Sequence, residues 1–535
     1  MPRATFEDDW FEEVAEQLGI DFVYTDGSIS GHYQLLESVG GGIAAVDYDL
    51  DGWQDLFMNQ GGTIHLENGT LKISGLASGL FRNLDQAGFV NISLNARIAE
   101  AELFTHGLTV ADINADGIAD LIVAGFGGLR AWINLGDGTF EERSSVLGLA
   151  SSSWNVVPAA ADFDLDGLVD LYVVTYADWR PSVDQPCLND RGVRDICGPT
   201  LYSGQQDKLF GNTSDGFADI TASVGLVAAN RGLGIVAADV DSDGRIDVVV
   251  VNDVEANQLY INGLDGRFIE KGAFAGVAYS SSGEREGSMG IDLGDFNHDG
   301  EPDLWYTNYV NQDNSLLINT GGAGFVNSSD VMGLGGVSRR WVGFGTHLAD
   351  FDGDGWQDLF VANGHVAYER LDSPYYQPPQ LFANKLGRSA EDVSARAGPY
   401  FASDRSGRGS AKVDFDNDGD WDIVIMHQNE PVAVLRNRNS SEFWIRIQLV
   451  GTEVERSGVG AKVTVEQGDT EENSWRIGGG SYLSHSDSRM LYTLKSEEPV
   501  VATVTWPGGS REVFENLTPN RTYTLIQGRK SYDAP

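Results

Sequence analysis

A nine-residue acidic pattern, Asp-x-Asp-x-Asp-Gly-x-x-Asp, recurs along the chain with small variations. Side chains at positions 1, 3, 5 and 9 and the backbone carbonyl at position 7 offer oxygen atoms, while Gly at position 6 permits a sharp turn. Ca²⁺ binds six to eight oxygens at about 2.3–2.6 Å, whereas Mg²⁺ prefers a stricter octahedron with retained waters. Without a cation, carboxylates this close would repel one another. The seven copies of the pattern therefore predict about seven Ca²⁺ ions.

The expected ligands can be named loop by loop. Two loops carry Asn instead of Asp at position 3, and the residue at position 7 contributes only its carbonyl. Because each loop supplies its own set of ligands with no open position, we expect the ions to be structural rather than catalytic. The predicted ligands are Asp47, Asp49, Asp51, Trp53 and Asp55; Asp112, Asn114, Asp116, Ile118 and Asp120; Asp162, Asp164, Asp166, Leu168 and Asp170; Asp239, Asp241, Asp243, Arg245 and Asp247; Asp295, Asn297, Asp299, Glu301 and Asp303; Asp350, Asp352, Asp354, Trp356 and Asp358; and Asp414, Asp416, Asp418, Asp420 and Asp422.

Two weaker signatures accompany the acidic loops. After each loop comes a short apolar stretch ending in Asn, as in Leu80-Phe-Arg-Asn83. A segment like Phe140-Glu-Glu-Arg-Ser then follows six of the loops but not the last. A matching segment, Phe11 to Ile20, precedes all of them. The N-terminus therefore holds the element that the last repeat lacks, as closure of a ring requires.

The repeats predict the fold. Each unit contains apolar runs of three to six residues separated by turn residues, which is typical of short β-strands. Units of about 60 residues with four such strands match propeller blades. We expect an all-β, seven-bladed β-propeller over residues 1–438, closed by the N-terminal strand and carrying an insertion at 176–207. A linear solenoid is the alternative, but it would need no exchange between the chain ends.

Residues 442–530 follow a different pattern. Apolar and polar residues alternate, as in Trp444 to Leu449, and turn residues recur every eight to twelve positions. This pattern is typical of a small β-sandwich or barrel. The polar linker at 436–442 is short, so we expect the two domains to touch. His485, after a Gly-rich stretch, is expected to be a surface turn residue.

These motifs resemble a known family. The repeats are similar to the FG-GAP/VCBS repeats of integrin α-subunit propellers. The C-terminal region resembles an ASPIC/UnbV domain through Ile445–Gly451, Ser457–Val463, Gly478–Ser484 and Val504–Gly509. Together they resemble the cartilage-acidic-protein family and its bacterial relatives, although Met490–Leu494 stands where that family usually has a Gly-containing segment. The resemblance implies a β-propeller with Ca²⁺ loops and export from the cell, and it implies no particular activity.

Charge limits the partners. Acidic residues number 79 and basic residues 36, giving a net charge of −43. Such a surface argues against binding to nucleic acid or to an anionic membrane. No apolar run is long enough for a transmembrane helix, and the acidic N-terminus has no signal-peptide core. We expect an extracellular or periplasmic location from the family resemblance, while a cytoplasmic location stays open.

The two cysteines, Cys187 and Cys197, lie ten residues apart within the insertion. The spacing allows either a disulfide or two free thiols. We predict a disulfide, which would fit an oxidising compartment. Long insertions of this kind often form lids or partner surfaces.

Polar and aromatic residues precede several of the expected innermost strands. In this repeat class they should meet at the mouth of the channel, on the face opposite the acidic loops. Converging arginines would form an anion site, whereas the alternative is a solvated rim whose charges pair with one another, such as Glu286 with Arg340. The candidates are His106, Arg231, Glu284, Arg285, Glu286, Arg340, Trp341, His347, Arg405 and Arg408.

We expect a calcium-stabilised binding protein that recognises a carbohydrate, a protein or a small anionic ligand at the channel mouth. The alternative is an enzyme of the lyase, cyclase, hydrolase or alkylating type with its active site there. In that case an Arg or His would act as acid or electrophile, and Glu284 or Glu286 as base. The sequence contains no G-x-S-x-G motif, no P-loop and no zinc-ligand spacing.

Overall fold

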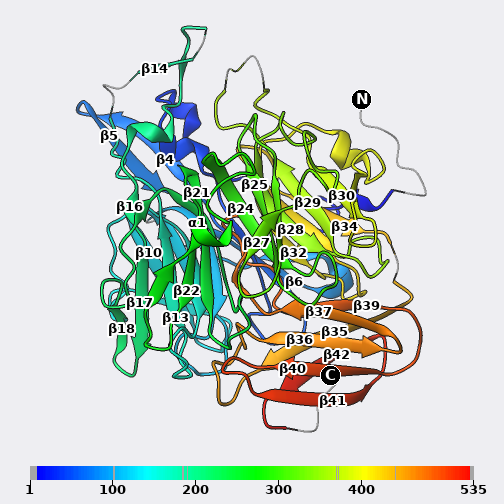
Figure 1. Ribbon diagram of the computed structural model, residues 1–535. Helices are drawn as coiled ribbons and strands as arrows, with labels where there is room; N and C mark the ends of the chain where they lie inside the picture. The colour runs from blue at the N-terminus through cyan, green and yellow to red at the C-terminus, as the bar shows by residue number, and fades with distance from the viewer. Residues whose placement is uncertain are drawn as a thin grey trace.

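The computed structural model describes residues 9–99, 103–182, 186–189, 191–368, 370, 373–439 and 441–529. Strands and turns dominate this part of the chain, which is therefore all-β, as predicted (Figure 1). None of its helices is long and apolar enough to cross a membrane. The helices are α1 (Gly272–Ala275) and the short 3-10 helices η1 (Ser28–Ser30), η2 (Leu35–Ser38), η3 (Asp85–Ala87), η4 (Pro199–Leu201) and η5 (Pro399–Ala402).

Four-stranded antiparallel sheets follow one another along the chain. In each, the first strand runs into an acidic loop and the second leaves it. In strand order the sheets are β2 (Ile43–Val46), β3 (Asp55–Met58), β6 (Gly79–Asn83) and β7 (Phe89–Asn91); β8 (Phe104–Ala111), β9 (Asp120–Phe126), β10 (Gly128–Asn134) and β11 (Phe140–Glu142); β12 (Asn155–Ala161), β13 (Asp170–Thr175), β17 (Lys208–Thr213) and β18 (Gly216–Asp219); β20 (Gly232–Ala238), β21 (Asp247–Glu255), β22 (Gln258–Asn262) and β23 (Phe268–Glu270); β24 (Glu286–Gly294), β25 (Asp303–Asn308), β26 (Ser315–Asn319) and β27 (Phe325–Asn327); β28 (Gly343–Ala349), β29 (Asp358–Asn363), β30 (Gln380–Asn384) and β31 (Ala390–Asp392); and β32 (Gly407–Val413), β33 (Asp422–His427), β34 (Ala433–Asn437) and β1 (Phe11–Glu13). An additional pairing of β21 with β24 joins two neighbouring sheets into one larger sheet.

The sheets form a closed ring. The first strands of successive sheets are neighbours, and β32 of the last sheet lies beside β2 of the first. The N-terminal strand β1 pairs antiparallel with β34, placing Phe11 opposite Asn437. The pairing that the repeat pattern predicts between the two ends of the ring is thus present. It leaves β34 no free edge.

Apolar side chains fill the spaces between successive sheets. Phe57 of β3 and Leu80 of β6 share one buried cluster with Leu108 of β8 and Trp132 of β10. Each sheet therefore packs face to face with the next one, as in a β-propeller, and burial of these faces stabilises the ring.

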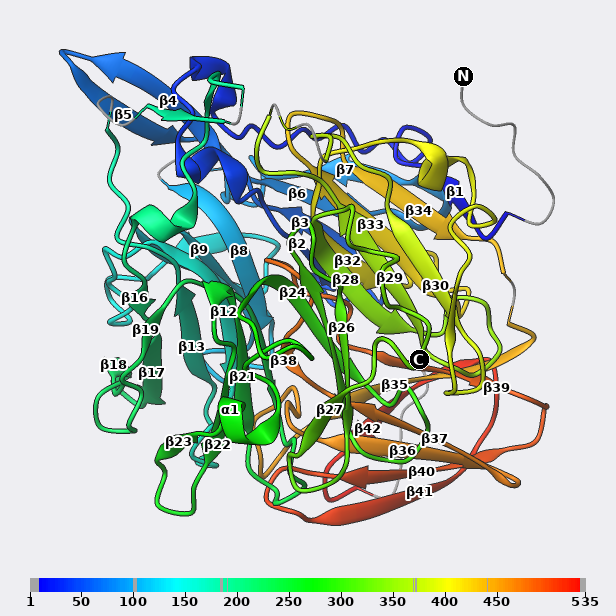
Figure 2. The same ribbon diagram turned by 45° about the horizontal axis from the view of Figure 1, so that its top comes forward.

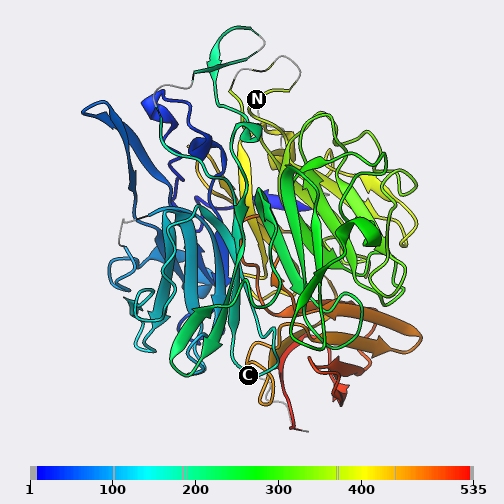
Figure 3. The same ribbon diagram turned by 60° about the vertical axis from the view of Figure 1, so that its left-hand side comes forward.

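Three small two-stranded sheets lie outside the four-stranded sheets of the ring. Two are hairpins, β4 (Gly62–Glu67) with β5 (Thr70–Gly75) and β14 (Cys187–Leu188) with β15 (Arg194–Asp195), and they lie away from the C-terminal sheets, toward the top of Figure 1. Figure 3 shows β14 and β15 standing over the ring. The third sheet pairs β16 (Gln205–Gln206) with β19 (Ala229–Asn230), which β17 and β18 separate in the chain.

The C-terminal region contains two further sheets with their own buried core. Ile445, Val463, Tyr492 and Trp506 belong to this core, which period-two alternation predicts. One sheet is β39 (Met490–Leu494), β35 (Phe443–Val450) and β42 (Arg521–Ile526), and the other is β37 (Thr470–Trp475), β36 (Lys462–Gln467), β40 (Val500–Thr505) and β41 (Arg511–Leu517).

Residues 478–487, which we call the channel segment, leave this region and run through the middle of the ring (Figure 2). The strand β38 (Gly478–Gly479) pairs antiparallel with β20, so that Gly479 lies opposite Val236. Beyond it, the Leu483 carbonyl accepts a 3.1 Å hydrogen bond from the amide of Leu108 in β8. The His485 amide donates to the Ile43 carbonyl of β2 at 2.8 Å.

The channel segment also reaches the remaining first strands. Ser481 Oγ accepts the Thr346 amide of β28 at 3.1 Å and donates to the Ser410 carbonyl of β32 at 2.9 Å. The Ser481 carbonyl accepts the Ile291 amide of β24, and Gly478 lies against the Ala160 carbonyl of β12. The channel is therefore filled by backbone from the C-terminal region, and the channel segment ties all the first strands together.

Candidate functional site

The acidic loops cluster their carboxylates. In five loops, the aspartates at positions 1, 3 and 9 place oxygen atoms within 4.8 Å of one another. These groups are Asp47, Asp49 and Asp55; Asp162, Asp164 and Asp170; Asp239, Asp241 and Asp247; Asp350, Asp352 and Asp358; and Asp414, Asp416 and Asp422. Such sets of hard oxygen donors suit Ca²⁺.

Backbone hydrogen bonds shape each loop. In the first loop, Asp47 accepts the amides of Asp51 and Gly52 at 3.0 and 2.9 Å. Gly52 has φ 88°, a left-handed conformation that glycine adopts without strain. Asp55 accepts the amides of Tyr48 and Asn83 at 3.2 and 2.7 Å. The sequence thus fixes the direction in which these carboxylates point.

Buried oxygen atoms remain without a hydrogen-bond donor in four of these loops. They are the Oδ1 atoms of the position-3 residues Asp49, Asp241, Asp352 and Asp416. A buried acceptor without a donor costs free energy, which a bound cation would offset. Burial also raises the pKa of Asp55 to about 8. The donor set therefore fits a hard divalent cation.

The two loops with Asn at position 3 differ from the other five. Asn114 Nδ2 donates to Asp116 Oδ2 at 2.9 Å, and Asn297 Nδ2 donates to Asp299 Oδ2 at 2.8 Å. The amide thus occupies part of the acceptor capacity of the position-5 carboxylate. With one carboxylate fewer, these two loops attract a cation more weakly than their neighbours.

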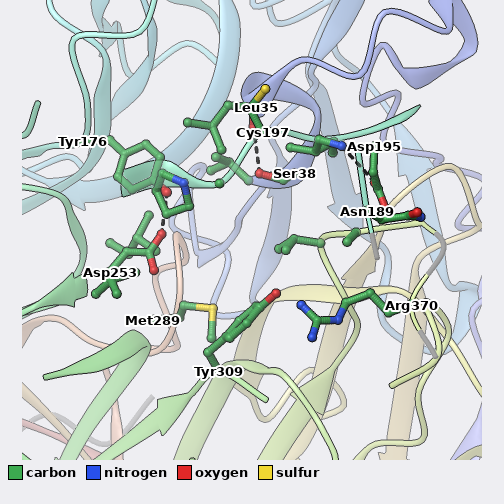
Figure 4. A pocket seen from close by; sticks show the side chains of 18 of the residues that line it. Leu35, Ser38, Tyr176, Asn189, Asp195, Cys197, Asp253, Met289, Tyr309 and Arg370 are labelled. Atoms are coloured by element: carbon green, nitrogen blue, oxygen red, sulfur yellow. Dashed lines mark hydrogen bonds between the residues drawn. The ribbon is translucent and has the colours of Figure 1, made fainter. Parts of the chain in front are cut away.

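A cavity of about 380 Å³ lies at the mouth of the channel, on the face opposite the acidic loops. Figure 4 shows it from close by. Leu233, Met289 and Phe344 come from first strands of three sheets, and Tyr482 of the channel segment closes the floor. Tyr176, Asp253, Val254 and Tyr309 also line the cavity. The remaining wall comes from Leu35, Ser38 and Val39 of the N-terminal segment, from Leu188, Asn189, Arg191 and residues 195–199 of the insertion, and from Val366, Ala367 and Arg370. Aromatic and aliphatic side chains thus enclose a few polar groups, the usual composition of a small-molecule site.

Asp253 places a carboxylate on the inner wall of this cavity. Its Oδ2 atom accepts a 2.5 Å hydrogen bond from the hydroxyl of Tyr176, and Figure 4 shows this pair side by side. Burial raises the pKa of Asp253 to about 6, while the Tyr176 hydroxyl and Arg231 act in the opposite direction. Near neutral pH the carboxylate is an acceptor for donors such as hydroxyl groups.

The disulfide-closed hairpin covers one side of the cavity. Cys187 and Cys197 are joined by a disulfide, which confirms the predicted pairing. Asp195 of this hairpin accepts the amide of Tyr368 at 3.1 Å. The guanidinium of Arg194 lies over the ring of Tyr33, 5.5 Å from its centroid. These contacts hold the hairpin against the N-terminal segment and against residue 368.

Three of the predicted rim residues are buried inside the ring. His106 Nδ1 contacts the Gly40 carbonyl at 2.8 Å, and His347 Nε2 contacts Ser410 Oγ at 3.0 Å. Burial lowers the pKa of His106 to about 4. Arg408 donates to backbone carbonyls, among them that of Ser38 at 2.9 Å, and lies 4.2 Å from the centroid of the Phe344 ring.

The other candidates are engaged elsewhere or exposed. Arg231 pairs with Glu255 at 3.1 Å and Arg405 with Glu430 at 3.1 Å. Glu286 contacts the hydroxyls of Tyr306 and Ser315 instead of Arg340. Glu284, Arg285 and Arg340 are exposed, and Arg340 lies over the half-buried Trp341 ring. Among the described residues that line the cavity, none belongs to the ten candidates.

One sequence expectation is wrong, and three cavity residues were not predicted. His485 is 5 % exposed and lies in the channel, so the expected surface position is wrong. Sequence reasoning also missed Tyr176, Asp253 and Tyr482 as cavity residues. Tyr176 begins the insertion that the sequence marks as a potential lid. Tyr482 follows the Gly478-Gly-Gly run, whose small residues let the backbone approach β20.

Comparisons with known proteins agree with the repeat pattern. A family model described as FG-GAP-like repeat matches residues 112–173, 239–306 and 295–361, and one described as ASPIC and UnbV matches residues 451–531. Cartilage acidic protein 1 of Homo sapiens is 25 % identical over 491 residues, covering 79 % of this chain and 71 % of the relative. Its Mus musculus counterpart is 26 % identical over 469 residues, covering 76 % and 70 %. The chain carries FG-GAP-like repeats and an ASPIC/UnbV domain and is homologous to cartilage acidic protein 1.

Solved structures show more distant likenesses. A lectin of Agrocybe aegerita that recognises non-reducing terminal N-acetylglucosamine has a TM-score of 0.39 and 17 % identity, covering 68 % of this chain and 89 % of the lectin. YCF48 bound to D1 peptide has a TM-score of 0.39 and 9 % identity, covering 74 % and 97 %. These scores are too low to carry an argument about ligands.

Proposed function

We propose that this homologue of cartilage acidic protein 1 is a calcium-stabilised binding protein that holds a carbohydrate in the cavity at the channel mouth. One observation carries the proposal: the cavity of about 380 Å³ combines aromatic walls with the carboxylate of Asp253. Sugar rings present C–H faces that pack on aromatic rings and hydroxyl groups that donate to carboxylates. The cavity size falls within the range of small-molecule sites.

The scaffold of this site is a seven-bladed propeller over residues 1–438, joined to an ASPIC/UnbV domain over residues 442–530. Counting the two halves of the large sheet separately gives seven four-stranded units, which supports this assignment. Each blade places its acidic loop on the face that meets the C-terminal domain. The channel mouth is on the other face, so the acidic loops and the ligand cavity are separated by the length of the channel.

About seven Ca²⁺ ions complete this scaffold in the proposal. Each acidic loop would hold one ion through its side chains at positions 1, 3, 5 and 9 and the carbonyl at position 7. The clustered carboxylates and the unpartnered buried oxygens support this assignment. The ions would neutralise carboxylates and hold the turns, and they take no part in ligand chemistry.

Binding is favoured over catalysis by the placement of the candidate groups. An enzyme of the kind considered above needs an acid and a base facing the substrate. His106 and His347 are buried, Arg231 and Arg405 are paired, and Glu286 contacts other protein hydroxyls. Asp253, hydrogen-bonded to Tyr176, lines the cavity together with Asp195, Arg191 and Arg370, and this set of donors and acceptors suits recognition of hydroxyl groups. A site outside the cytoplasm is supported by the disulfide beside the cavity.

A glycan array followed by titration calorimetry tests the proposal. We expect a carbohydrate to bind, and we expect Asp253→Asn and Tyr309→Ala to weaken binding by roughly tenfold or more through lost hydrogen bonds and ring packing. Arg285→Ala and Arg340→Ala are matched controls, because both arginines are exposed outside the cavity. If the arginine variants lose binding while the cavity variants keep it, the ligand binds on the rim. If no glycan binds, the proposal that the cavity holds a carbohydrate is wrong.

A further inference from the structure

A second cavity lies at the opposite end of the channel, between the acidic loops and the C-terminal domain. Its volume is about 500 Å³. The C-terminal domain contributes four arginines to its wall, namely Arg446, Arg456, Arg476 and Arg489. Arginines therefore converge at this end of the channel, and none of the four is among the candidates that the sequence named for the channel mouth.

Two of these arginines form ion pairs with carboxylates. Arg489 forms a bidentate pair with Asp487, with Nε 2.9 Å from Oδ1 and Nη2 2.5 Å from Oδ2. Arg446 Nη1 contacts Asp414 Oδ2 at 2.5 Å. These two guanidinium groups hold the C-terminal domain on the last acidic loop. Arg456 is exposed and lies against Gly117 of the second loop.

Arg476 differs from the others. Its residue is 8 % exposed, and its guanidinium makes one hydrogen bond, from Nη1 to the Ile477 carbonyl at 3.0 Å. Within the described chain, Nε and Nη2 have no hydrogen-bond or ion-pair partner. These donor groups are not among the buried polar atoms that lack a partner, so solvent reaches them from the cavity, and they match the oxygen atoms of an anion.

Nearby carboxylates are already occupied. Glu455 accepts the amides of Ser457 and Val459 at 2.7 and 2.5 Å. Asp487 is held by Arg489, and Asp292, on an adjoining cavity of about 90 Å³, lies 3.4 Å from Lys412 Nζ. Arg476 lines both cavities, as does the buried His485. Glu455 and Asp487 still attract the Arg476 guanidinium electrostatically, but neither is hydrogen-bonded to it, so its remaining donors face the two cavities beside His485.

We propose that Arg476 is the recognition group of a binding site for one small oxyanion, a sulfate, phosphate or carboxylate, at the domain interface. His485 and the Ser488 hydroxyl, which line the same cavity, supply further donors. A guanidinium binds oxyanions through two parallel N–H donors. Asp47, Asp51 and Asp112 also line this cavity, and they belong to the loops that hold cations in the proposed function. With cations bound there, the arginines set the sign of the local potential.

Sulfate titration of the calcium-loaded full chain tests the site. We expect saturable sulfate binding that sodium chloride at equal ionic strength does not reproduce. Arg476→Gln should weaken it by at least about tenfold, because charge-assisted hydrogen bonds are lost. Arg511→Gln is the control, since Arg511 is exposed and lines neither of these two cavities. Equal affinity of Arg476→Gln and the wild type, or equal response to chloride, would overturn the proposal.

Two measurements keep the test independent of folding and of the loops. Arg476→Lys preserves the charge but not the paired donors, so it should bind sulfate more weakly than wild type and more tightly than Arg476→Gln. Metal content of the same samples separates failure of the calcium assignment from failure of the anion site. A crystal of the wild-type chain grown with selenate should show an anomalous peak beside Arg476. If the interface is well ordered in these crystals and no anomalous peak lies beside Arg476, the proposed site is wrong.

Discussion

Asn83 Nδ2 donates a 2.8 Å hydrogen bond to the backbone carbonyl of Phe415, a residue 332 positions later in the chain. This bond joins the first repeat to the acidic loop of the last one. The corresponding Asn of every other repeat donates in the same way to the loop before it. Those pairs are Asn134 to Tyr48, Asn212 to Ile113, Asn262 to Phe163, Asn319 to Val240, Asn384 to Phe296 and Asn437 to Phe351.

Removing one of these amides should destabilise the ring. We expect Asn262→Ala to lower the free energy of unfolding by about 1–3 kcal/mol, because it leaves the buried Phe163 carbonyl without its donor. Denaturant unfolding in calcium measures the loss. Asn95→Ala, at an exposed turn, is the control and should stay within about 0.5 kcal/mol of the wild type. Equal effects of the two changes would show that the Asn ladder does not stabilise the ring.

Calcium removal should lower the melting temperature sharply. Bound ions stabilise the folded state by linkage, and their loss leaves clustered carboxylates unpaired. Metal analysis of the purified chain should find about seven Ca²⁺, and a chelator titration should release the ions of the Asn114 and Asn297 loops first. Zinc in place of calcium, fewer than about four ions, or a melting curve unchanged by excess chelator would contradict the assignment.

The effect of pH should change sign with calcium. Burial raises the pKa of Asp55 to about 8 and that of Asp120 to about 7, so without metal the folded state binds protons that the unfolded state does not. Stability in chelator should therefore rise as the pH falls from about 8 to about 6. With calcium bound, protons compete with the ion, and stability should fall over the same range. Melting curves at constant ionic strength measure both trends. If the melting temperature changes with pH in the same direction with and without calcium, the prediction is wrong.

A methyl group at Gly42 should dislodge the channel segment. A Cβ there would lie 1.8 Å from the Leu483 carbonyl, and backbone cannot move aside cheaply. We expect Gly42→Ala to destabilise the protein by about 3 kcal/mol. Gly198→Ala is the control, because a Cβ at Gly198 meets no atom within 4 Å. If both variants melt alike, the channel segment is not tightly held.

Local pattern predicts much of this molecule. The acidic loops follow from spacing within nine residues, and the strand that follows each loop is apolar in nearly every repeat. The directions of the rim side chains are set in a different way. Arg231 and Arg405 precede first strands as expected, yet their direction is set by Glu255 and Glu430 on neighbouring chain segments. No repeating sequence pattern identifies these two glutamates as partners of the arginines.

The contents of the channel are even harder to predict from the sequence. Its contents come from residues 478–487, far along the chain from the strands they contact, and no repeat relates the two. His485 looks like a turn residue because its neighbours are Gly, Ser and Asp. Its burial depends on backbone pairing with Ile43, which is more than four hundred residues earlier. Only tertiary structure brings these segments together.

Because Phe11 pairs with Asn437, the ring cannot close until β34 has been synthesised. A ribosome makes the N-terminal strand first, but its partner β34 emerges only after more than four hundred further residues. During that interval the nascent chain is an open arc with an unpaired edge at each end, a state prone to pairing with other chains. The channel segment emerges later still and must enter a ring that is already assembled or assembling. A chain truncated before residue 437 would therefore be expected to form an arc, whereas one truncated shortly after it would be expected to form a closed ring without the channel segment.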